Sequence, residues 1–441
     1  MMAQKVCAAF MQSEVWFNQK DGTMLVLRVL WLGLLCFGAT AVLQAEDLVK
    51  TGTANQRLVS FDNVMVDFVT KNSLPGAALA VGREGKLFYE RGYGWADVEQ
   101  QQPVQPTSLF RIASISKPVT GVAILKLCQD GRLKLEDKAF DLLKLEPHLS
   151  LETKADPLLA DITIRQLLQH TSGWDRDQSF DPMFRSIGIA ESLMVPAPAK
   201  PEHVIRYMLG RPLDFAPGQR YAYSNFGYCV LGRVIEKVSG QSYEEYVQTS
   251  ILKPLGITTM KIGRTRLAER AANEVRYYSK KPQDGPSVFA DDLGKPVPHP
   301  YGAWYLEAMD SHGGWIASAS DLVKFAMQFD LPPQKRLLNE DSIKVMMQRP
   351  EGRAGHDDKG LPSPFYYGCG WSVRPLNDSR EANIWHNGSL PGTSTIVVRR
   401  GRDKLCWAVL FNSRDTNPPP SSQIDPLMHS AANLVKEWPA D

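Results

Sequence analysis

The sequence predicts an α+β fold, an α/β sandwich in which an antiparallel sheet is flanked by N- and C-terminal helices and a mainly helical region is inserted. Strand-like runs lie near both ends, at 77–94 and from Tyr366 onward, whereas the stretch 131–365 shows mostly helical spacing of apolar residues. We therefore expect one α/β part made from about 56–130 and 366–441, with the helical part of about 131–365 between its two pieces.

The first predicted elements are a helix and a hairpin. Apolar residues at helical spacing from Leu58 to Phe68 predict an amphipathic helix that ends near Pro75-Gly76. The stretch that follows favours two strands joined by a turn at Glu84-Gly85.

The C-terminal region returns to strands and closes on a helix. A turn is predicted at Gly401-Arg402-Asp403, and Asp425 and Pro426 are the expected cap and first residue of the closing helix. The predicted strands are 366–373, 393–400 and 404–412. The predicted apolar stripe of the closing helix comprises Leu427, Leu434 and Trp438.

Two long polar and Pro-rich interruptions, at 173–201 and 273–300, break the helical region. Loops of that length inside a compact protein are usually functional or mobile. We expect them to be mostly irregular in structure.

Composition and charge are those of an ordinary globular protein and do not favour a nucleic-acid-binding protein. The chain has 441 residues, of which 43% are hydrophobic and 22% charged, as in ordinary globular proteins with one large or two interleaved domains. The formal net charge is only +2 and no long run has one sign, so nothing indicates a nucleic-acid partner.

The N-terminal region has the layout of a secretory signal peptide. One arginine precedes a dense apolar run at 29–43, and Ala45 follows at a position suited to cleavage. We expect residues 1–45 to be a signal peptide with an over-long start, since Met24 is the better initiator, and 46–441 to be the mature, secreted or periplasmic chain. The run is short for a membrane span of roughly 20 residues, and an uncleaved signal anchor is the alternative.

The cysteines do not indicate a metal site. Cleavage would remove Cys7 and Cys36, and Cys128 and Cys229 fall in apolar helical patterns that favour a core position. Spacing leaves open whether Cys369 and Cys406, both in strand-like runs, form a disulfide. No Cys/His cluster has metal-ligand spacing, and we expect no metal and no cofactor.

The stretch FRIASISKPVT, residues 110–120, is the first candidate for chemistry. Its polar residues lie where a strand-like run gives way to an amphipathic helix, with Pro118 in the first turn and Gly131 at the end. A spacing of three puts Ser114 and Lys117 on one helix face, where an amine can reach a hydroxyl. An isolated S-x-x-K is more often a cap followed by a solvated lysine, and Ser250 to Lys253 has the same spacing.

Two further stretches supply groups that a hydroxyl nucleophile needs, namely a base, a proton relay and donors for an oxyanion. Tyr223-Ser224-Asn225 comes just before an apolar helical run and is the only Y-x-N in the chain. His386-Asn387-Gly388-Ser389 is expected just ahead of the strand at 393–400.

With these three motifs in this order, the chain resembles the serine β-lactamase-related hydrolases. That family includes class C β-lactamases, D-alanyl-D-alanine carboxypeptidases and related esterases, and carries S-x-x-K, then Y-x-N, then K-T-G or H-x-G. The resemblance runs from about Leu58 to Trp438. It also covers the stretches 162–174, 216–225, 242–257 and 313–326.

The resemblance implies a β-lactamase/transpeptidase-like fold, with 46–441 as the catalytic domain, and a role for each motif residue. Ser114 would attack an acyl carbon, while Lys117 and Tyr223 would move the protons. Asn225 would orient the lysine and hold a substrate carbonyl. The implied substrate-binding residues are Asn225, His386, Gly388 and Ser389, with the main-chain N–H groups of Ser114 and Ser389 as the oxyanion hole.

Other matches to the motifs are expected to have no catalytic role. Lys50-Thr51-Gly52 precedes the serine, and His312-Gly313-Gly314 is predicted to lead into a helix rather than a strand. His170 is expected to be structural, as a lone histidine near a helix end usually is. The aromatic residues Tyr301, Trp304 and Tyr305 suit either a substrate pocket or loop packing.

The histidine at 386 bears on the substrate. Many members of the family have lysine there, a fixed cation for a substrate carboxylate, whereas histidine is mostly neutral near pH 7. We therefore expect a serine hydrolase acting on a small ester or peptide. The alternatives are a true β-lactamase or D-alanyl-D-alanine carboxypeptidase that takes a lactam or D-amino-acid peptide, and a non-catalytic envelope protein that binds ligands with the same fold.

Overall fold

The computed structural model describes residues 48–149, 154–281, 283–376 and 381–439. The predicted signal peptide, its cleavage at Ala45, the start at Met24 and the first two cysteines lie outside these residues.

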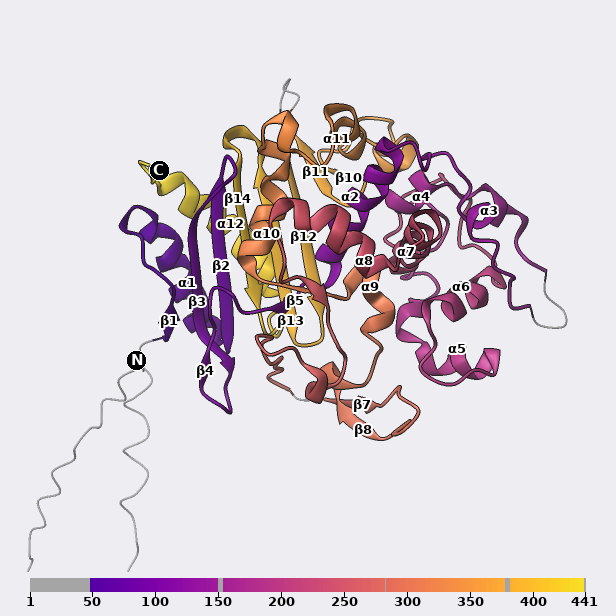
Figure 1. The fold of residues 1–441 in the computed structure, drawn as a ribbon, viewed down its shortest axis with the longest axis horizontal. Coiled ribbons are helices and arrows are strands. Elements are labelled where there is room, and N and C mark those ends of the chain that lie inside the picture. The colour runs from indigo at the N-terminus through magenta and orange to yellow at the C-terminus, as the bar shows by residue number, and fades with distance from the viewer. Residues whose placement is uncertain (1–47, 150–153, 282, 377–380, 440–441) are drawn as a thin grey trace, which may run out of the picture. The chain divides into compact units, whose positions relative to one another are not determined.

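One large antiparallel sheet organises the described part of the chain (Figure 1). Its strands come from both ends of the sequence, because β2 of the N-terminal hairpin pairs with β14 near the C-terminus, with Ala80 opposite Ala408. The strand order is β1 (Lys50–Thr51), β3 (Lys86–Asp97), β2 (Gly76–Arg83), β14 (Leu405–Phe411), β13 (Thr393–Arg400), β12 (Ala382–Leu390), β11 (Ser372–Pro375) and β10 (Tyr366–Tyr367), with β4 (Gln102–Pro103) paired to β3.

Both faces of the sheet are covered, which explains why β14 is apolar throughout. Successive side chains of a strand point to opposite faces. Accordingly, Ala408 and Leu410 belong to one buried cluster and Trp407 and Val409 to another. Helices α1 (Val59–Asn72) and α12 (Pro420–Leu434) cover one face, and α10 (Ala319–Met327) packs on the other against β2 and β14.

The remaining helices lie on the same side of the sheet as α10, and most of them are grouped around α2 (Figure 1). They are α2 (Ser116–Gln129), α3 (Ala139–Leu143), α4 (Ile164–Leu168), α5 (Ser186–Leu193), α6 (Pro201–Leu209), α7 (Asn225–Ser239), α8 (Tyr243–Val247), α9 (Asp310–Gly313) and α11 (Glu340–Met346). Smaller sheets are formed by β5 (Phe110–Arg111), β9 (Trp315–Ala317) and β6 (Lys261–Ile262), and by β7 (Asp284–Pro286) with β8 (Pro296–Pro298).

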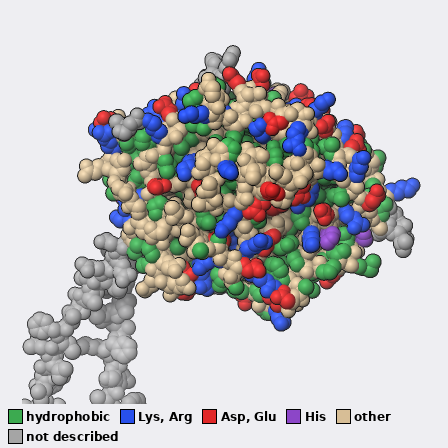
Figure 2. All heavy atoms as spheres, in the orientation of Figure 1, with side chains coloured by type: hydrophobic (Ala, Val, Ile, Leu, Met, Phe, Trp, Pro, Cys, Tyr) green, Lys and Arg blue, Asp and Glu red, His purple; other side chains and the backbone are tan. Residues whose placement is uncertain are grey.

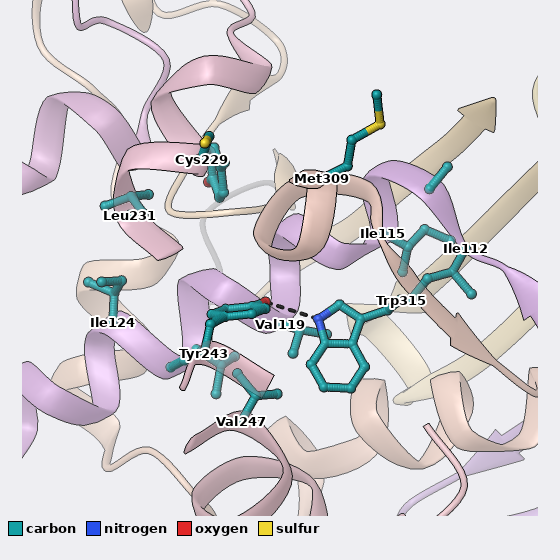
Figure 3. Packing of buried hydrophobic residues seen from close by; sticks show 14 of the residues in the cluster. Ile112, Ile115, Val119, Ile124, Cys229, Leu231, Tyr243, Val247, Met309 and Trp315 are labelled. Atoms are coloured by element: carbon teal, nitrogen blue, oxygen red, sulfur yellow. Dashed lines mark hydrogen bonds between the residues drawn. The ribbon is translucent and has the colours of Figure 1, made fainter. Parts of the chain in front are cut away.

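Helix α2 is buried along most of its length. Figure 3 shows part of the apolar cluster around it. Val119 and Ile124 point into an apolar cluster, where the Tyr243 hydroxyl accepts a hydrogen bond of 3.0 Å from the Trp315 indole. A helix enclosed in this way is held firmly at its first turn, which carries Lys117 and directly follows the turn that carries Ser114.

The fold class is confirmed, and so are the first helix and the hairpin, which turns at Glu84-Gly85. The closing helix was predicted to begin at Pro426, and this is wrong, since α12 begins at Pro420 and contains Pro426. Leu427 and Leu434 are 41% and 71% exposed, while the buried face carries residues such as Ile424 and Met428. The two leucines of the predicted stripe are therefore on the wrong side of the helix, whereas Trp438, the third residue, lies beyond the helix and packs against the buried cluster.

The two interruptions contain more structure than the sequence indicated. The first includes α5, and the second includes the short β7 and β8 pair. The four cysteines of the described residues are all free thiols, including Cys369 and Cys406. On the visible face of the molecule, Lys and Arg are interspersed with Asp and Glu (Figure 2), as a net charge near zero suggests.

Candidate active site

Ser114 lies in a single 3₁₀ turn, Ala113–Ile115, between β5 and α2. Its predecessor Ala113 has φ of 49°, a left-handed conformation that costs energy for any residue with a side chain. The hydroxyl of Ser116 donates a 2.7 Å hydrogen bond to the Ala113 carbonyl and stabilises this turn. The second serine of the motif therefore fixes the backbone that presents the first.

Lys117 is completely buried, and its amine touches three polar groups. Nζ lies 3.2 Å from Ser114 Oγ, 2.7 Å from Asn225 Oδ1 and 3.0 Å from the carbonyl oxygen of His312. None of these groups is a carboxylate. Burial lowers the pKa of Lys117 well below its usual value, with repulsion from Arg176 adding to the effect and attraction to Asp181 opposing it.

An ammonium could donate to all three oxygens, but burial without a carboxylate contact favours the neutral amine. The neutral amine has two N–H donors for the two acceptors, the Asn225 amide oxygen and the His312 carbonyl, and one lone pair for the Ser114 hydroxyl. An ammonium has three donors and no lone pair, so it could not accept the serine proton. The geometry therefore suits Lys117 as a base toward Ser114.

Tyr223 lies beside this pair, just before α7, whose cap Ser224 accepts a hydrogen bond from the Gly227 N–H. The Tyr223 ring centroid is 4.7 Å from Lys117 Nζ, and its hydroxyl is hydrogen-bonded to Ser114. Burial raises the pKa of Tyr223, and the bond to Ser114 only partly offsets that rise. The phenol therefore keeps its proton at neutral pH and can donate it.

His170 holds the tyrosine in place. Its carbonyl accepts from Ala222 N–H at 2.8 Å, its Nδ1 accepts from Ser224 N–H at 3.1 Å, and its ring lies 4.4 Å from the ring of Tyr223. Burial lowers the pKa of His170 well below the usual value, so the ring is neutral and Nδ1 can accept. The expectation that His170 is structural agrees with these contacts, which make it a positioning residue for Tyr223.

Asn225 is oriented by a residue that the sequence analysis missed. Its Nδ2 donates a 2.6 Å hydrogen bond to Asp181 Oδ2, which leaves Oδ1 turned toward Lys117. Asp181 falls in the interruption at 173–201, and the only signal in the sequence was the length of that loop.

The histidine motif lies inside a strand, not ahead of one as predicted. His386 to Ser389 belong to β12, which pairs with β13 with Gly388 opposite Thr395. The Asn-Gly pair is typical of turns, but the turn occurs at Pro391-Gly392, where Gly392 has φ of 79°. Pairing with β13 outweighs the local preference of the polar sequence.

Gly388 brings β12 against the turn that holds Ser114. A side-chain carbon on Gly388 would collide with the Ile112 carbonyl oxygen and the Thr395 hydroxyl. Thr395 Oγ1 itself donates a 3.0 Å hydrogen bond to that Ile112 carbonyl. Only glycine allows this approach, which places Ser389 on the walls of the same two cavities as Ser114.

His386 differs from expectation in its hydrogen bonding. Its Nδ1 lies 2.7 Å from the Asn387 carbonyl, which can only accept, and its Nε2 lies 2.9 Å from the Tyr367 hydroxyl. The ring therefore donates through Nδ1 and accepts through Nε2, and no ring nitrogen is left for a substrate. Burial lowers the pKa of His386 to about 3, so the ring is uncharged at neutral pH.

His312 was set aside on the basis of its sequence context, and that reasoning is corrected by the structure. The motif leads into the short strand β9 before the helix α10, and the His312 carbonyl is one of the two acceptors for Lys117. The available signal in the sequence was the similarity of 313–326 to the family, a similarity that does not by itself assign His312 to the site.

The other motif matches lie elsewhere. Lys50-Thr51-Gly52 begins on β1, at the opposite edge of the sheet from β12 and β10, and Ser250 and Lys253 lie in the helical turns after α8. Tyr301 and Trp304 pack around the buried Arg111 guanidinium, each with its ring centroid 5.4 Å away, which favours loop packing over pocket lining.

Two cavities meet at Ser114, and Arg176 and Ser389 border both of them. The first, about 300 Å³ and here called the Tyr223 cavity, is lined by Ser114, Tyr223, His386, Gly388, Tyr221 and Tyr367, among others. The second, about 380 Å³ and here called the Arg414 cavity, is lined by Ser114, Asn225, Phe184, Met309, Leu390 and Arg414, among others.

Within the described residues, no group of three or more His, Cys, Asp or Glu side chains is placed to hold a metal ion. Across the same residues, no helix combines the length and the apolar character that crossing a membrane requires.

Comparison with known proteins identifies the family. The Beta-lactamase family model matches residues 61–430, and the chain belongs to this family, whose members are serine hydrolases. The family and the fold expected from the resemblance are thereby confirmed.

The relatives are distant in sequence. The chain is 28% identical over 362 residues to protein flp of Staphylococcus aureus (strain N315), covering 82% of this chain and 64% of that protein. It is also 28% identical over 333 residues to penicillin-binding protein 4* of Bacillus subtilis (strain 168), covering 75% and 66%. The chain thus spans somewhat less than two thirds of the length of these relatives.

A solved structure with the same fold is the octameric penicillin-binding protein homologue from Pyrococcus abyssi. It superposes with a TM-score of 0.63 at 26% identity, covering 86% of this chain and 77% of that one.

Proposed function

We propose that this protein is an exported serine hydrolase that cleaves small ester or amide substrates through an acyl-enzyme on Ser114. The observation that carries the proposal is the Lys117 amine, buried without a carboxylate contact and 3.2 Å from the Ser114 hydroxyl. A buried lysine with a lowered pKa beside a hydroxyl is suited to general-base catalysis.

In the acylation step, neutral Lys117 takes the proton of Ser114 as its oxygen bonds to the carbonyl carbon of the substrate. Asn225 and the His312 carbonyl accept the two N–H groups of the amine, so its lone pair is aimed at the serine. The negative charge on the carbonyl oxygen is stabilised by the N–H groups of Ser114 and Ser389.

The position of β12 supports Ser389 as an oxyanion donor. Among the described residues, β11 pairs with β12 only as far as Trp385, so the edge from His386 to Leu390 has no strand partner on that side. This edge instead contacts the turn that contains Ser114.

Tyr223 then delivers a proton to the leaving group as the bond between the leaving group and the acyl carbon breaks. The phenol is protonated at neutral pH, its hydroxyl interacts with Ser114 and its ring centroid lies 4.7 Å from Lys117 Nζ. The proton taken by the lysine is therefore held close by and can restore the one that Tyr223 donates. Water attacks the acyl-enzyme by the reverse sequence of proton transfers and releases the acid.

The choice of esters and amides rests on His386. Its ring is neutral and both its nitrogens are engaged within the protein, so it supplies neither the charge nor the donor that a lysine would supply. The second candidate, a β-lactamase or carboxypeptidase, is favoured by the naming of the Bacillus subtilis relative as a penicillin-binding protein.

Labelling of the intact protein separates these candidates. A fluorophosphonate and a penicillin are incubated in parallel with wild type, Ser114→Ala and Ser250→Ala, and adducts are detected by mass. We expect a fluorophosphonate adduct in wild type and Ser250→Ala, none in Ser114→Ala, and little penicillin adduct. Equal labelling of the Ser114→Ala protein would contradict the assignment of the nucleophile, and rapid penicillin labelling would favour the second candidate.

Export rests on the signal-peptide layout of residues 1–45. N-terminal sequencing of protein from the native host is expected to find a chain that begins at or near Glu46. A cytoplasmic product that retains the apolar run would contradict it.

A further inference from the structure

The Arg414 cavity has two positively charged side chains in its lining and no acidic side chain among the described residues that line it. The two charged side chains are those of Arg176 and Arg414. Its other walls include apolar side chains, among them Phe184, Met309 and Leu390. An apolar pocket with guanidinium groups and no acid suits an anionic ligand with an apolar stem.

Of the two arginines that line the cavity, Arg414 is the one whose guanidinium has no hydrogen-bond or ion-pair partner among the described residues. Asp415, its neighbour in sequence, instead accepts hydrogen bonds from the Ser279 hydroxyl and the Lys280 N–H. Arg176, by comparison, stacks on Tyr223 at 4.7 Å and makes a loose 3.8 Å ion pair with the exposed Asp177.

The surroundings of Arg414 show the same imbalance of charge. Partial burial lowers the pKa of the Arg414 guanidinium, and attraction to Asp415 does not fully offset this. Burial, together with the charge of Arg414, lowers the pKa of His299, which lines the same cavity. A carboxylate bound here would attract the Arg414 guanidinium and so offset the cost of burying its charge.

The two cavities differ in which end of a substrate they can hold. Tyr223, the proton donor for the leaving group, lines the Tyr223 cavity and does not line the other. Asn225 lines the Arg414 cavity. A substrate with its reacting carbon at Ser114 would thus place its leaving group in the Tyr223 cavity and its acyl chain in the Arg414 cavity.

We propose that Arg414, assisted by Arg176, selects substrates whose acyl group ends in a carboxylate, such as the half-esters or half-amides of a short dicarboxylic acid. This inference rests on the proposed function and adds to it a substrate class, with an anionic acyl group and an uncharged leaving group.

Two esters of matched shape test the inference, the mono-4-nitrophenyl ester of glutaric acid and 4-nitrophenyl 5-methylhexanoate. Their acyl chains differ in a terminal carboxylate against an isopropyl group. The measured quantity is the ratio of kcat/KM for the anionic ester to kcat/KM for the neutral one, after subtraction of spontaneous hydrolysis. A charged hydrogen bond lost in Arg414→Gln should lower this ratio by roughly 10- to 100-fold.

Two further variants make the result specific to the charge of Arg414. Arg414→Lys keeps the positive charge and should retain part of the ratio, which a merely structural role would not predict. Arg353→Gln is the matched control, because Arg353 is 68% exposed, pairs with Asp358 and lines neither cavity. It should leave the ratio unchanged.

The outcomes separate this inference from the proposed function. Suppose that the neutral ester is hydrolysed in a Ser114-dependent way and that Arg414→Gln leaves the kcat/KM ratio unchanged. This result would overturn the preference for an anionic acyl group but would still support the proposed hydrolase function. Absence of Ser114-dependent hydrolysis of both esters would overturn the proposed function. A ratio lowered equally by Arg353→Gln would also overturn the role of Arg414.

Discussion

At the scale of single residues, the protonation of Lys117 is central. The side chain is buried against one hydroxyl and two acceptors and contacts no carboxylate, so burial favours a neutral amine, whose lone pair can face the hydroxyl. Burial raises the pKa of the neighbouring Tyr223 phenol, so this group keeps its proton at neutral pH. One fold region thus contains a base and an acid that are both in working form at neutral pH.

The first prediction separates the basicity of Lys117 from its charge. Lys117→Arg keeps a long stem and a cation, but a guanidinium does not lose its proton in proteins. We expect kcat/KM for a neutral activated ester to fall by about 10³-fold or more, with no recovery up to pH 9. The same change at the unrelated motif match, Lys253→Arg, should have little effect. Substantial activity in the Lys117→Arg protein would mean that lysine acts as a fixed charge.

A second prediction concerns the Tyr223 hydroxyl. Tyr223→Phe preserves the ring that packs against His170 and Lys117 and removes only the donor and acceptor. Thermal stability should change little, while turnover should fall by about 10²-fold or more. Retained turnover with an unchanged pH profile would make Tyr223 a packing residue.

At the scale of elements, the site depends on how closely β12 approaches the turn at Ala113–Ile115. That approach is possible because Gly388 has no side chain to meet the Ile112 carbonyl. The strained Ala113 and its hydrogen bond from Ser116 complete the turn on the other side. A strand edge and a turn from opposite ends of the sequence therefore form the two walls around the nucleophile.

The third prediction tests that contact. Gly388→Ala must push β12 away from Ile112, and a displacement of about 1 Å at the oxyanion donors is expected to lower kcat/KM by about 10²-fold. The matched control is Gly188→Ala in α5, where an added carbon meets nothing within 4 Å and a gain of about 0.5 to 1 kcal/mol in stability is expected. Near-normal activity of Gly388→Ala would show that the two walls do not need this close contact.

At the scale of the whole molecule, the site lies where the sheet meets the helical layer, and it brings together three buried histidines. His170, His312 and His386 all have pKa values lowered by burial, the first two well below the usual value. Each is neutral in the folded protein but takes up a proton near pH 6.5 when the chain unfolds. Their contribution to stability is therefore present above about pH 6.5 and is lost as the pH falls toward the folded-state pKa.

The fourth prediction states how much of this pH-dependent loss of stability comes from His386 alone. With a folded-state pKa of about 3, His386 should account for about 2 kcal/mol of the decrease in unfolding free energy between pH 7 and pH 5. Urea unfolding of wild type and His386→Asn at both pH values measures it. The variant should lose about 2 kcal/mol less than wild type over this interval. An equal loss in both proteins would mean that His386 is protonated in the folded state.

Local patterns determined much of the fold and the candidate site. Apolar spacing predicted α1 and the β2–β3 hairpin, and the order of three short motifs pointed to Ser114, Lys117, Tyr223 and the β12 segment, which lie together in the structure. These features are visible in sequence because helix periodicity, strand runs and motif chemistry each depend on residues close together in the chain.

Tertiary structure decided what depends on distant partners. Pairing with β13 made a strand of a segment whose Asn-Gly pair favours a turn. Packing against the sheet chose the buried face of α12, and long-range contacts brought Asp181 to Asn225 and the His312 carbonyl to Lys117. Burial then set the charge states of Lys117 and His386. A side chain's burial and its hydrogen-bond partners are properties of the assembled core, because they depend on residues 40 or more positions away that no local pattern encodes.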